Sequence, residues 1–294
     1  MSDVGVRSHH RSPLRHHEEN EESPLKARTG YRQIRGAPPQ QQDALLVGER
    51  VLQGDDAAGE AAQAPPLIVG VADGVAATPH AERLSARLLL EIAHGYRQDG
   101  AAFNARLIRR AQTQLVQDVR AGRLKPSSAC TVVLAEVKND YVTVLNTGDS
   151  RAYLIDRLTG ELRRLSKDHT AFQLLKDEGE LPADAQDRDY GSVATGLLEA
   201  VTAAPMADQD FQVHMDYARL RDSQLVLLCS DGVTAHLSDD EIAAEVVAAD
   251  RAGADPAASI VARVHERGAS DNTTVIAAQP SAKSVRDKRS EARC

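Results

Sequence analysis

The sequence predicts an α+β fold, a four-layer αββα sandwich in which two mainly antiparallel sheets lie between helix pairs. Three observations predict it: apolar runs typical of buried strands, hairpin signals between consecutive runs, and helical periodicity that comes in pairs. No long linker divides the 294 residues, so we expect one domain with a sizeable core. We assign residues 29–279 to this domain and residues 1–28 and 280–294 to polar tails, the first of them disordered.

Strands and helices follow a definite order in the first half of the chain. Two apolar runs, Ala44–Val51 and Leu67–Ala72, predict strands. Two helices are expected next, because apolar residues recur at helical spacing: Leu84, Leu88 and Ile92 in the first, and Ile108, Ala111, Leu115 and Val119 in the second.

The second half of the chain is predicted to form mostly strands. Two of the connections between these strands carry turn signals, Lys138–Asp140 and Thr159–Gly160. The polar stretch 179–191 is expected to form a mobile flap. The expected strands are Thr131–Val137, Tyr141–Asn146, Ala152–Ile155, Leu162–Leu165, Leu225–Ser230 and Thr273–Ala278. The expected helices are Phe172–Glu178, one that begins with the capping box Ser238-Asp-Asp-Glu241, and one opened by Asp255-Pro256.

Composition excludes several classes of function. The formal charge of −8 argues against a general affinity for nucleic acid or anionic membranes. Aromatic residues make up 3% of the chain and Trp is absent, so a base-stacking platform is not expected. No apolar run approaches the length of a membrane span, and three cysteines make no disulfide framework. We therefore expect a cytoplasmic, enzyme-sized domain without nucleic-acid or membrane partners. We also expect it to be a monomer.

Acidic residues stand at the ends of several predicted strands. The runs that start at Leu67 and Leu225 end in Asp73-Gly74 and Asp231-Gly232. Asp149 lies between two predicted strands, and Asp271 opens the last one. An unpaired charge at the rim of a core is costly, so a positive group is expected beside these carboxylates. Oxygen ligands of this kind suit hard cations such as Mg²⁺ or Mn²⁺.

The same residues also have a simpler interpretation. Asp-Gly is a common turn dipeptide, and a buried strand can end on Asp because the chain turns into water there. The repetition of one pattern at four places favours a cluster of metal-binding or catalytic carboxylates, while the turn interpretation stays open.

Seven short motifs in chain order, over about Gly30–Ala278, resemble those of the metal-dependent protein phosphatases of the type-2C (PPM) family, bacterial branch. Each motif is weak alone, and the order of the seven makes the resemblance specific. They are Gln42-Asp43-Ala44, Val71-Ala-Asp-Gly74, the pair Glu82 and Ser85, Asn146-Thr-Gly-Asp-Ser-Arg-Ala-Tyr153, Lys167-Asp-His-Thr170, Leu227-Leu-Cys-Ser-Asp-Gly232 and Ser270-Asp-Asn-Thr-Thr274.

The resemblance implies an αββα sandwich with a binuclear Mn²⁺ or Mg²⁺ site at one edge of the sheets. Asp73 would bridge the two ions, and Asp231 and Asp271 would bind one of them. The Gly74 carbonyl and, mainly through water, Asp43 would support the other ion. Asp149 and Asp231 match the acidic pair that holds a third, weaker ion in bacterial members.

Two departures from the family pattern concern catalysis. The family's phosphate-binding Arg corresponds to Pro38, and we expect Arg35 to reach the phosphate from a shifted loop. The family's general-acid His corresponds to Thr78. His80 is the candidate replacement, although it can equally be a solvated histidine at a helix start.

The resemblance implies a protein Ser/Thr phosphatase that hydrolyses phosphoserine and phosphothreonine by attack of a metal-bridging water. Its partners would be phosphorylated proteins, with a bacterial Ser/Thr kinase that it opposes. The missing Arg and His motivate an alternative, a catalytically weak pseudo-phosphatase that binds a partner. A third hypothesis is a phosphatase for small phosphate esters.

Overall fold

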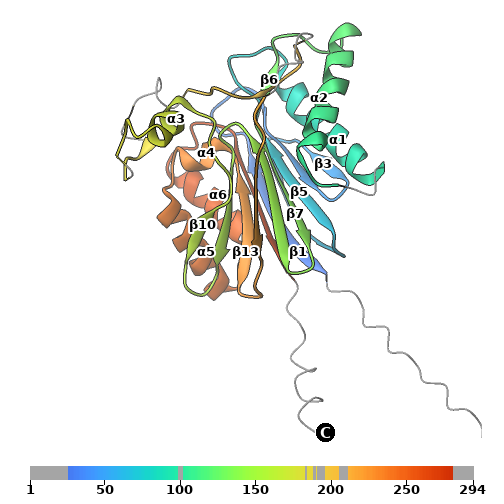
Figure 1. Ribbon diagram of the computed structural model, residues 1–294. Helices are drawn as coiled ribbons and strands as arrows, with labels where there is room; N and C mark the ends of the chain where they lie inside the picture. Colours follow the sequence, from blue (N-terminus) through green and yellow to red (C-terminus); the bar gives the residue numbers. More distant parts are fainter. Residues whose placement is uncertain are drawn as a thin grey trace, which may run out of the picture.

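The computed structural model describes residues 26–98, 102–182, 184–187, 190, 196–204 and 211–280. Two six-stranded sheets pack face to face, and helices cover both outer faces (Figure 1). The predicted four-layer αββα arrangement is confirmed. Most of the two predicted tails, residues 1–25 and 281–294, lies outside the described residues, as do residues 183, 188–189 and 191 of the predicted flap.

In the first sheet, sheet A, the first strand of the described chain (β1) pairs with the last (β14). Its strands pair antiparallel throughout, and its central strands β13 and β14 are almost fully buried apolar runs. In spatial order the strands are β10 (Leu162–Arg164), β9 (Arg151–Asp156), β13 (Gln224–Cys229), β14 (Thr273–Gln279), β1 (Ala27–Ile34) and β4 (Asp56–Gln63).

The other sheet, sheet B, is formed mainly by the first half of the chain. In spatial order its strands are β12 (His214–Arg219), β8 (Tyr141–Thr147), β7 (Val132–Lys138), β5 (Leu67–Ala72), β2 (Ala44–Val47) and β3 (Arg50–Leu52). The single strand predicted over Ala44–Val51 is a hairpin, because Gly48 turns the chain at a φ of 62°. A separate small sheet joins β6 (Ala129–Cys130) to β11 (Val201–Thr202).

Two helix pairs cover the sheets, as their apolar periodicity predicts. Helices α1 (Ala81–Gln98) and α2 (Ala105–Arg120) share an apolar cluster with sheet B. Helices α5 (Asp239–Ala252) and α6 (Pro256–Glu266) pack on sheet A, and the predicted capping box at the start of α5 is present. The short helices α3 (Ala171–Asp177) and α4 (Asp231–Thr234) lie near the upper ends of the strands as drawn in Figure 1.

The main core lies between the two sheets. Inward-facing side chains of both sheets fill it, among them Leu45, Val133, Val226 and Leu228. Burying one such side chain stabilises the fold by about 1.5–3 kcal/mol. This core fixes the sheets relative to each other and so fixes where their strand ends meet.

Strands β1 and β4 were not expected from the sequence. β4 reads Asp-Ala-Ala-Gly-Glu-Ala-Ala-Gln, without one β-branched or aromatic residue. It forms because β1 pairs with it over its whole length, and Gly59 makes room for the ring of Tyr31. β1 begins at Ala27, inside the stretch that we assigned to the N-terminal tail.

Candidate metal centre

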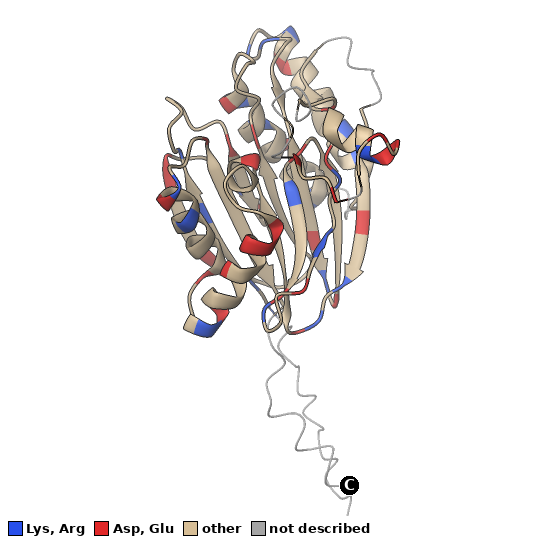
Figure 2. Cartoon of the chain, turned by 90° about the vertical axis from the view of Figure 1, so that its left-hand side faces the viewer, with Lys and Arg blue, Asp and Glu red and all other residues tan. Residues whose placement is uncertain are grey.

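The predicted carboxylates gather at one end of the sandwich: Asp43, Asp73, Asp149, Asp231 and Asp271, which we call the acidic edge. Antiparallel pairing brings them together. Ala44 at the start of β2 faces Ala72 at the end of β5, so the acids beside them are neighbours. In the same way Cys229 at the end of β13 faces Val275 near the start of β14. Figure 2 shows acidic residues (red) near the upper ends of the strands.

Asp43 is the most deeply buried member of the acidic edge. Its side chain is inaccessible to solvent, and its Oδ2 accepts hydrogen bonds from Thr274 Oγ1 at 2.7 Å and Ser230 Oγ at 2.8 Å. Its Oδ1 is buried and has no hydrogen-bond partner. Burial raises the pKa of Asp43 to about 7, and the charge of Asp231 adds to the rise.

The other carboxylates also affect one another. Burial raises the pKa of Asp73 well above its ordinary value, and the charges of Asp43, Asp231 and Asp149 raise it further. The pKa of Asp149 is raised by burial and by Asp231, and that of Asp271 by the same two causes. Asp231 therefore lies within electrostatic reach of every other member, while Arg151 offsets part of the rise at Asp149 and His236 part of the rise at Asp271.

Glycine follows two of these aspartates for a steric reason. A Cβ on Gly232 would lie 2.0 Å from the main-chain oxygen of Asn272, and one on Gly74 would lie 2.8 Å from that of Ala81. Backbone segments from different elements thus approach closely beside Asp231 and Asp73. Glycine is required at both positions by this packing, because neither residue has a positive φ.

The acidic edge fits hard divalent cations by its chemistry. Its donors are carboxylate oxygens, a buried Asp43 oxygen has no partner, and like charges raise the pKa of several members. Among the described residues, no three His, Cys, Asp or Glu side chains already have the spacing of a site for one ion. The fit is therefore one of ligand type and charge.

The loop that carries Arg35 is fastened beside Asp271. Asn272, which is almost fully buried, donates from Nδ2 to the main-chain oxygens of Arg35 at 2.6 Å and Gln40 at 3.1 Å. Its Oδ1 accepts from the Gln42 amide at 2.7 Å. The Arg35 guanidinium donates to the Pro38 carbonyl at 2.8 Å, and its Nε lies 3.5 Å from Asp55 Oδ2, so it binds its own loop and the residue before β4.

Thr78 and His80, just before α1, differ in their hydrogen bonds. Thr78 Oγ1 donates to the Val75 carbonyl at 2.8 Å and accepts from the Ala129 amide at 3.1 Å, which ties this hydroxyl into a turn. His80 has a φ of 55°, and its buried Nδ1 has no hydrogen-bond partner. A left-handed backbone at a non-glycine residue is uncommon and points to a local constraint.

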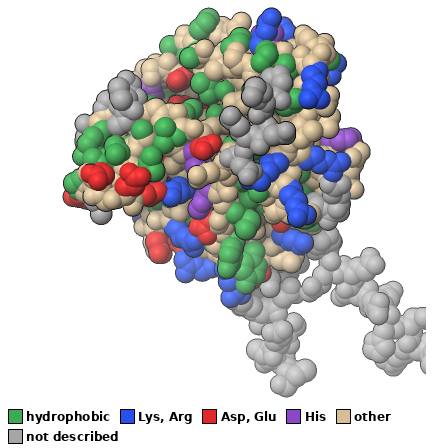
Figure 3. Space-filling view, turned by 45° about the horizontal axis from the view of Figure 1, so that its top comes forward, with side chains coloured by type: hydrophobic (Ala, Val, Ile, Leu, Met, Phe, Trp, Pro, Cys, Tyr) green, Lys and Arg blue, Asp and Glu red, His purple; other side chains and the backbone are tan. Residues whose placement is uncertain are grey.

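A cavity of about 640 Å³ opens beside the acidic edge, with Asp149 and Asp231 in its lining. Across it lie α3 and residues 185–187. The space-filling view shows apolar and acidic side chains together on the protruding part of the molecule at the left, where α3 lies (Figure 3). Leu174 and Leu175 of α3 are exposed there, next to Asp177.

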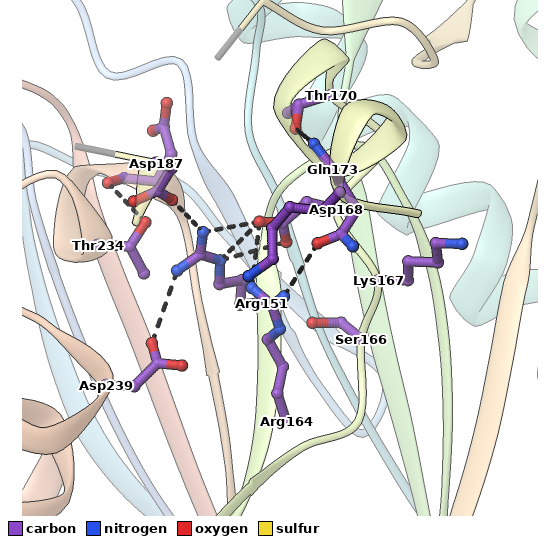
Figure 4. A network of polar contacts seen from close by, with 12 residues as sticks. Arg151, Arg164, Ser166, Lys167, Asp168, Thr170, Gln173, Asp187, Thr234 and Asp239 are labelled. Atoms are coloured by element: carbon purple, nitrogen blue, oxygen red, sulfur yellow. Dashed lines mark hydrogen bonds and ion pairs between the residues drawn. The ribbon is translucent and has the colours of Figure 1, made fainter. Parts of the chain in front are cut away.

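Sequence reasoning did not find the groups that hold the acidic edge in place. Ser230, Asn272 and Thr274 stand inside the quoted motifs but received no role. The same is true of Arg151, whose guanidinium binds Asp168 (Figure 4). Their positions beside the predicted ligands were the available signal, whereas their partners come from distant parts of the chain.

A family model described as protein phosphatase 2C matches residues 50–272, more than half of the chain. The chain belongs to the protein phosphatase 2C family. The matched range contains four members of the acidic edge, and Arg35 and Asp43 precede it.

Relatives in this family include two curated proteins. The serine/threonine phosphatase Stp of Listeria monocytogenes is 29% identical over 147 residues, 50% of this chain and 54% of that protein. The serine/threonine protein phosphatase PstP of Mycobacterium tuberculosis is 29% identical over 136 residues, 46% of this chain and 24% of that protein. The match thus spans about half of Stp and a quarter of PstP.

A solved structure agrees with the fold. The catalytic domain of PstP in complex with two manganese ions has a TM-score of 0.63 and 23% sequence identity, covering 88% of this chain and all of that one. At this identity the likeness concerns the αββα fold. No helix in the described part of the chain has the length and apolar character needed to cross a membrane.

Proposed function

We propose that the chain is a metal-dependent protein Ser/Thr phosphatase that hydrolyses phosphoserine and phosphothreonine in proteins. The observation that carries this proposal is the acidic edge, in which the charge of Asp231 raises the pKa of the four other carboxylates and a buried Asp43 oxygen has no hydrogen-bond partner. The curated relatives are named as serine/threonine phosphatases, which supports the same reaction.

Two Mn²⁺ or Mg²⁺ ions would be held by the acidic edge. Asp73 would bridge them, Asp231 and Asp271 would bind one, and the Gly74 carbonyl and Asp43 would support the other. Asp149 with Asp231 would hold a third, weaker ion. When bound, such ions lower the pKa of water and neutralise phosphate charge.

The remaining steps fall to this chain's own side chains. Arg35 would leave the Pro38 carbonyl and Asp55 and orient the phosphate, since its loop is fastened beside Asp271. His80 would give a proton to the departing serine or threonine oxygen, a role for which its buried Nδ1 has no competing hydrogen bond. The cavity beside Asp149 and Asp231 would receive the phosphorylated segment.

The proposal extends to the setting of the enzyme. We infer a monomeric cytoplasmic protein in bacterial signalling, which acts on phosphorylated proteins and opposes a Ser/Thr kinase. Neither nucleic acid nor a membrane is part of this proposal, as the formal charge of −8 suggests.

The test is hydrolysis of a phosphothreonine peptide with Mn²⁺, with EDTA, and by the Asp231→Asn variant. We expect turnover to need Mn²⁺ and to fall about 10²–10³-fold in the variant, since loss of a ligand removes charge stabilisation in the transition state. The matched control is Asp240→Asn, an exposed carboxylate of α5 outside the acidic edge. Full activity of Asp231→Asn would contradict the mechanism. Metal binding without turnover would indicate a protein that binds a partner. A higher kcat/KM for small phosphate esters than for phosphopeptides would indicate a phosphatase for small esters.

A further inference from the structure

One guanidinium joins three segments of the chain beside the acidic edge. Arg151 donates from Nε and Nη2 to Asp168 Oδ2 at 3.0 and 2.7 Å. Its Nη2 also donates to Asp187 Oδ2 at 2.6 Å, and its Nη1 lies 3.6 Å from Asp239 Oδ1 (Figure 4). Arg151 lies in β9, whereas Asp187 belongs to the segment after α3 and Asp239 begins α5.

The three contacts differ in burial. The side chains of Arg151 and Asp168 are 11% and 7% exposed, while that of Asp187 is 37% exposed. Asp168 also accepts from Arg164 Nη1 at 3.2 Å. A variant without the Asp187 carboxylate therefore keeps the buried Arg151–Asp168 pair, and the fold does not depend on Asp187 alone.

The segment 184–187 forms part of the cavity wall. Ala185, Gln186 and Asp187 line the same cavity as Asp149 and Asp231. From the side of α3, Lys176 Nζ donates to the Ala185 carbonyl at 3.2 Å. The wall is thus tied to α3 by Lys176 and to sheet A by the Asp187–Arg151 ion pair.

We propose that Asp187 is a positioning residue that, through Arg151, holds segment 184–187 as the wall against which a phosphorylated protein segment binds. The proposal rests on the proposed phosphatase function. A peptide that fills the cavity needs this wall, because its residues on both sides of the phosphate must be accommodated. A small ester reaches the acidic edge with fewer contacts, so it depends less on Asp187.

The experiment compares Asp187→Ala with the wild-type full chain in Mn²⁺. For a phosphothreonine peptide we expect kcat/KM to fall about fivefold more than for p-nitrophenyl phosphate, mostly through KM, as loss of a half-exposed ion pair allows. Hydrogen–deuterium exchange over residues 184–187 should rise in Asp187→Ala. Asp187→Glu, which keeps the carboxylate, should restore both readouts. Asp184→Ala is the matched control, because Asp184 is an exposed carboxylate of the same segment, whereas Arg151 binds Asp187.

Two results would overturn the proposal. One is equal exchange over residues 184–187 in wild type and Asp187→Ala, and the other is an equal loss of kcat/KM for peptide and small ester. Absence of any turnover by the wild type would instead contradict the proposed function. The exchange comparison needs no turnover, so it decides the role of Asp187 in that case as well.

Discussion

Thr274 donates a hydrogen bond to Asp43 Oδ2 at 2.7 Å, although 231 positions separate the two residues. Asp43 precedes β2 of sheet B and Thr274 lies in β14 of sheet A, so the bond joins the two sheets at the acidic edge. With Ser230 on the same oxygen, only Oδ1 of Asp43 is left without a partner. Ordinary side-chain hydrogen bonds thus hold a buried carboxylate in place and leave one oxygen available.

This bond predicts an effect on stability. Thr274→Val keeps the shape of the side chain but removes a donor to a buried carboxylate, so the free energy of unfolding should fall by about 1–3 kcal/mol. Urea unfolding measures the change. Thr29→Val is the control, because Thr29 Oγ1 is buried without a partner and its loss should be neutral or stabilising. Equal losses in the two variants would contradict this account.

Metal binding should change the effect of Asp231 on stability. In EDTA, Asp231→Asn should be more stable than wild type by about 1–2 kcal/mol, because Asp231 repels the other carboxylates. With Mn²⁺ the wild type should gain stability by mass action, and the variant should gain less. Calorimetric Tm values in EDTA and in a Mn²⁺ series test this, with Asp240→Asn as the control. A metal-free variant no more stable than wild type would show that the repulsion is unimportant.

Arg35→Ala should lower kcat/KM for a phosphothreonine peptide by about 10–100-fold, mainly through KM. A charge-assisted hydrogen bond to phosphate contributes about 1.5–3 kcal/mol, and the loop is already fastened beside Asp271. Arg32→Ala, which removes an ion pair with Asp56 instead, is the control. If kcat/KM is the same in Arg35→Ala and wild type, Arg35 does not bind the phosphate.

His80→Ala should slow hydrolysis of phosphothreonine far more than hydrolysis of p-nitrophenyl phosphate. Loss of proton donation costs about 10²–10⁴-fold for a poor leaving group such as an alcohol. p-Nitrophenolate leaves without a proton, so its kcat should change little. His94→Ala, at an exposed position of α1, is the control. Equal losses for both substrates would assign His80 a structural role.

Glu241, in the first turn of α5, should make the free energy of unfolding depend on pH. Hydrogen bonds from Arg267, with help from the Ser238 amide, lower the pKa of Glu241 from 4.5 to about 2. A carboxylate with a lowered pKa stabilises the folded state above its unfolded pKa. That contribution is therefore complete above pH 4.5 and disappears as the pH falls to about 2. The difference in unfolding free energy between wild type and Glu241→Gln should vanish over this range, while exposed Glu178→Gln gives the background.

The fold was predictable where local pattern and burial agree. The helix with Leu84, Leu88 and Ile92 and the buried strand Leu225–Ser230 correspond to α1 and β13. β4 was missed, since nothing in its Ala-rich sequence favours a strand before β1 pairs with it. The same distinction holds for the site. The acidic residues stand out in the sequence, whereas the bond from Thr274 to Asp43 does not.

The sequence by itself determined the class of fold, the order of most elements and the carboxylates at the strand ends, because these follow from local periodicity and turn chemistry. Only the tertiary structure decided that Asp43 is buried beneath Ser230 and Thr274, that Asn272 fastens the Arg35 loop, and that Arg151 binds Asp187. The physical reason is that these contacts join residues far apart in the chain. They exist only after the core between the sheets has fixed where the strand ends meet.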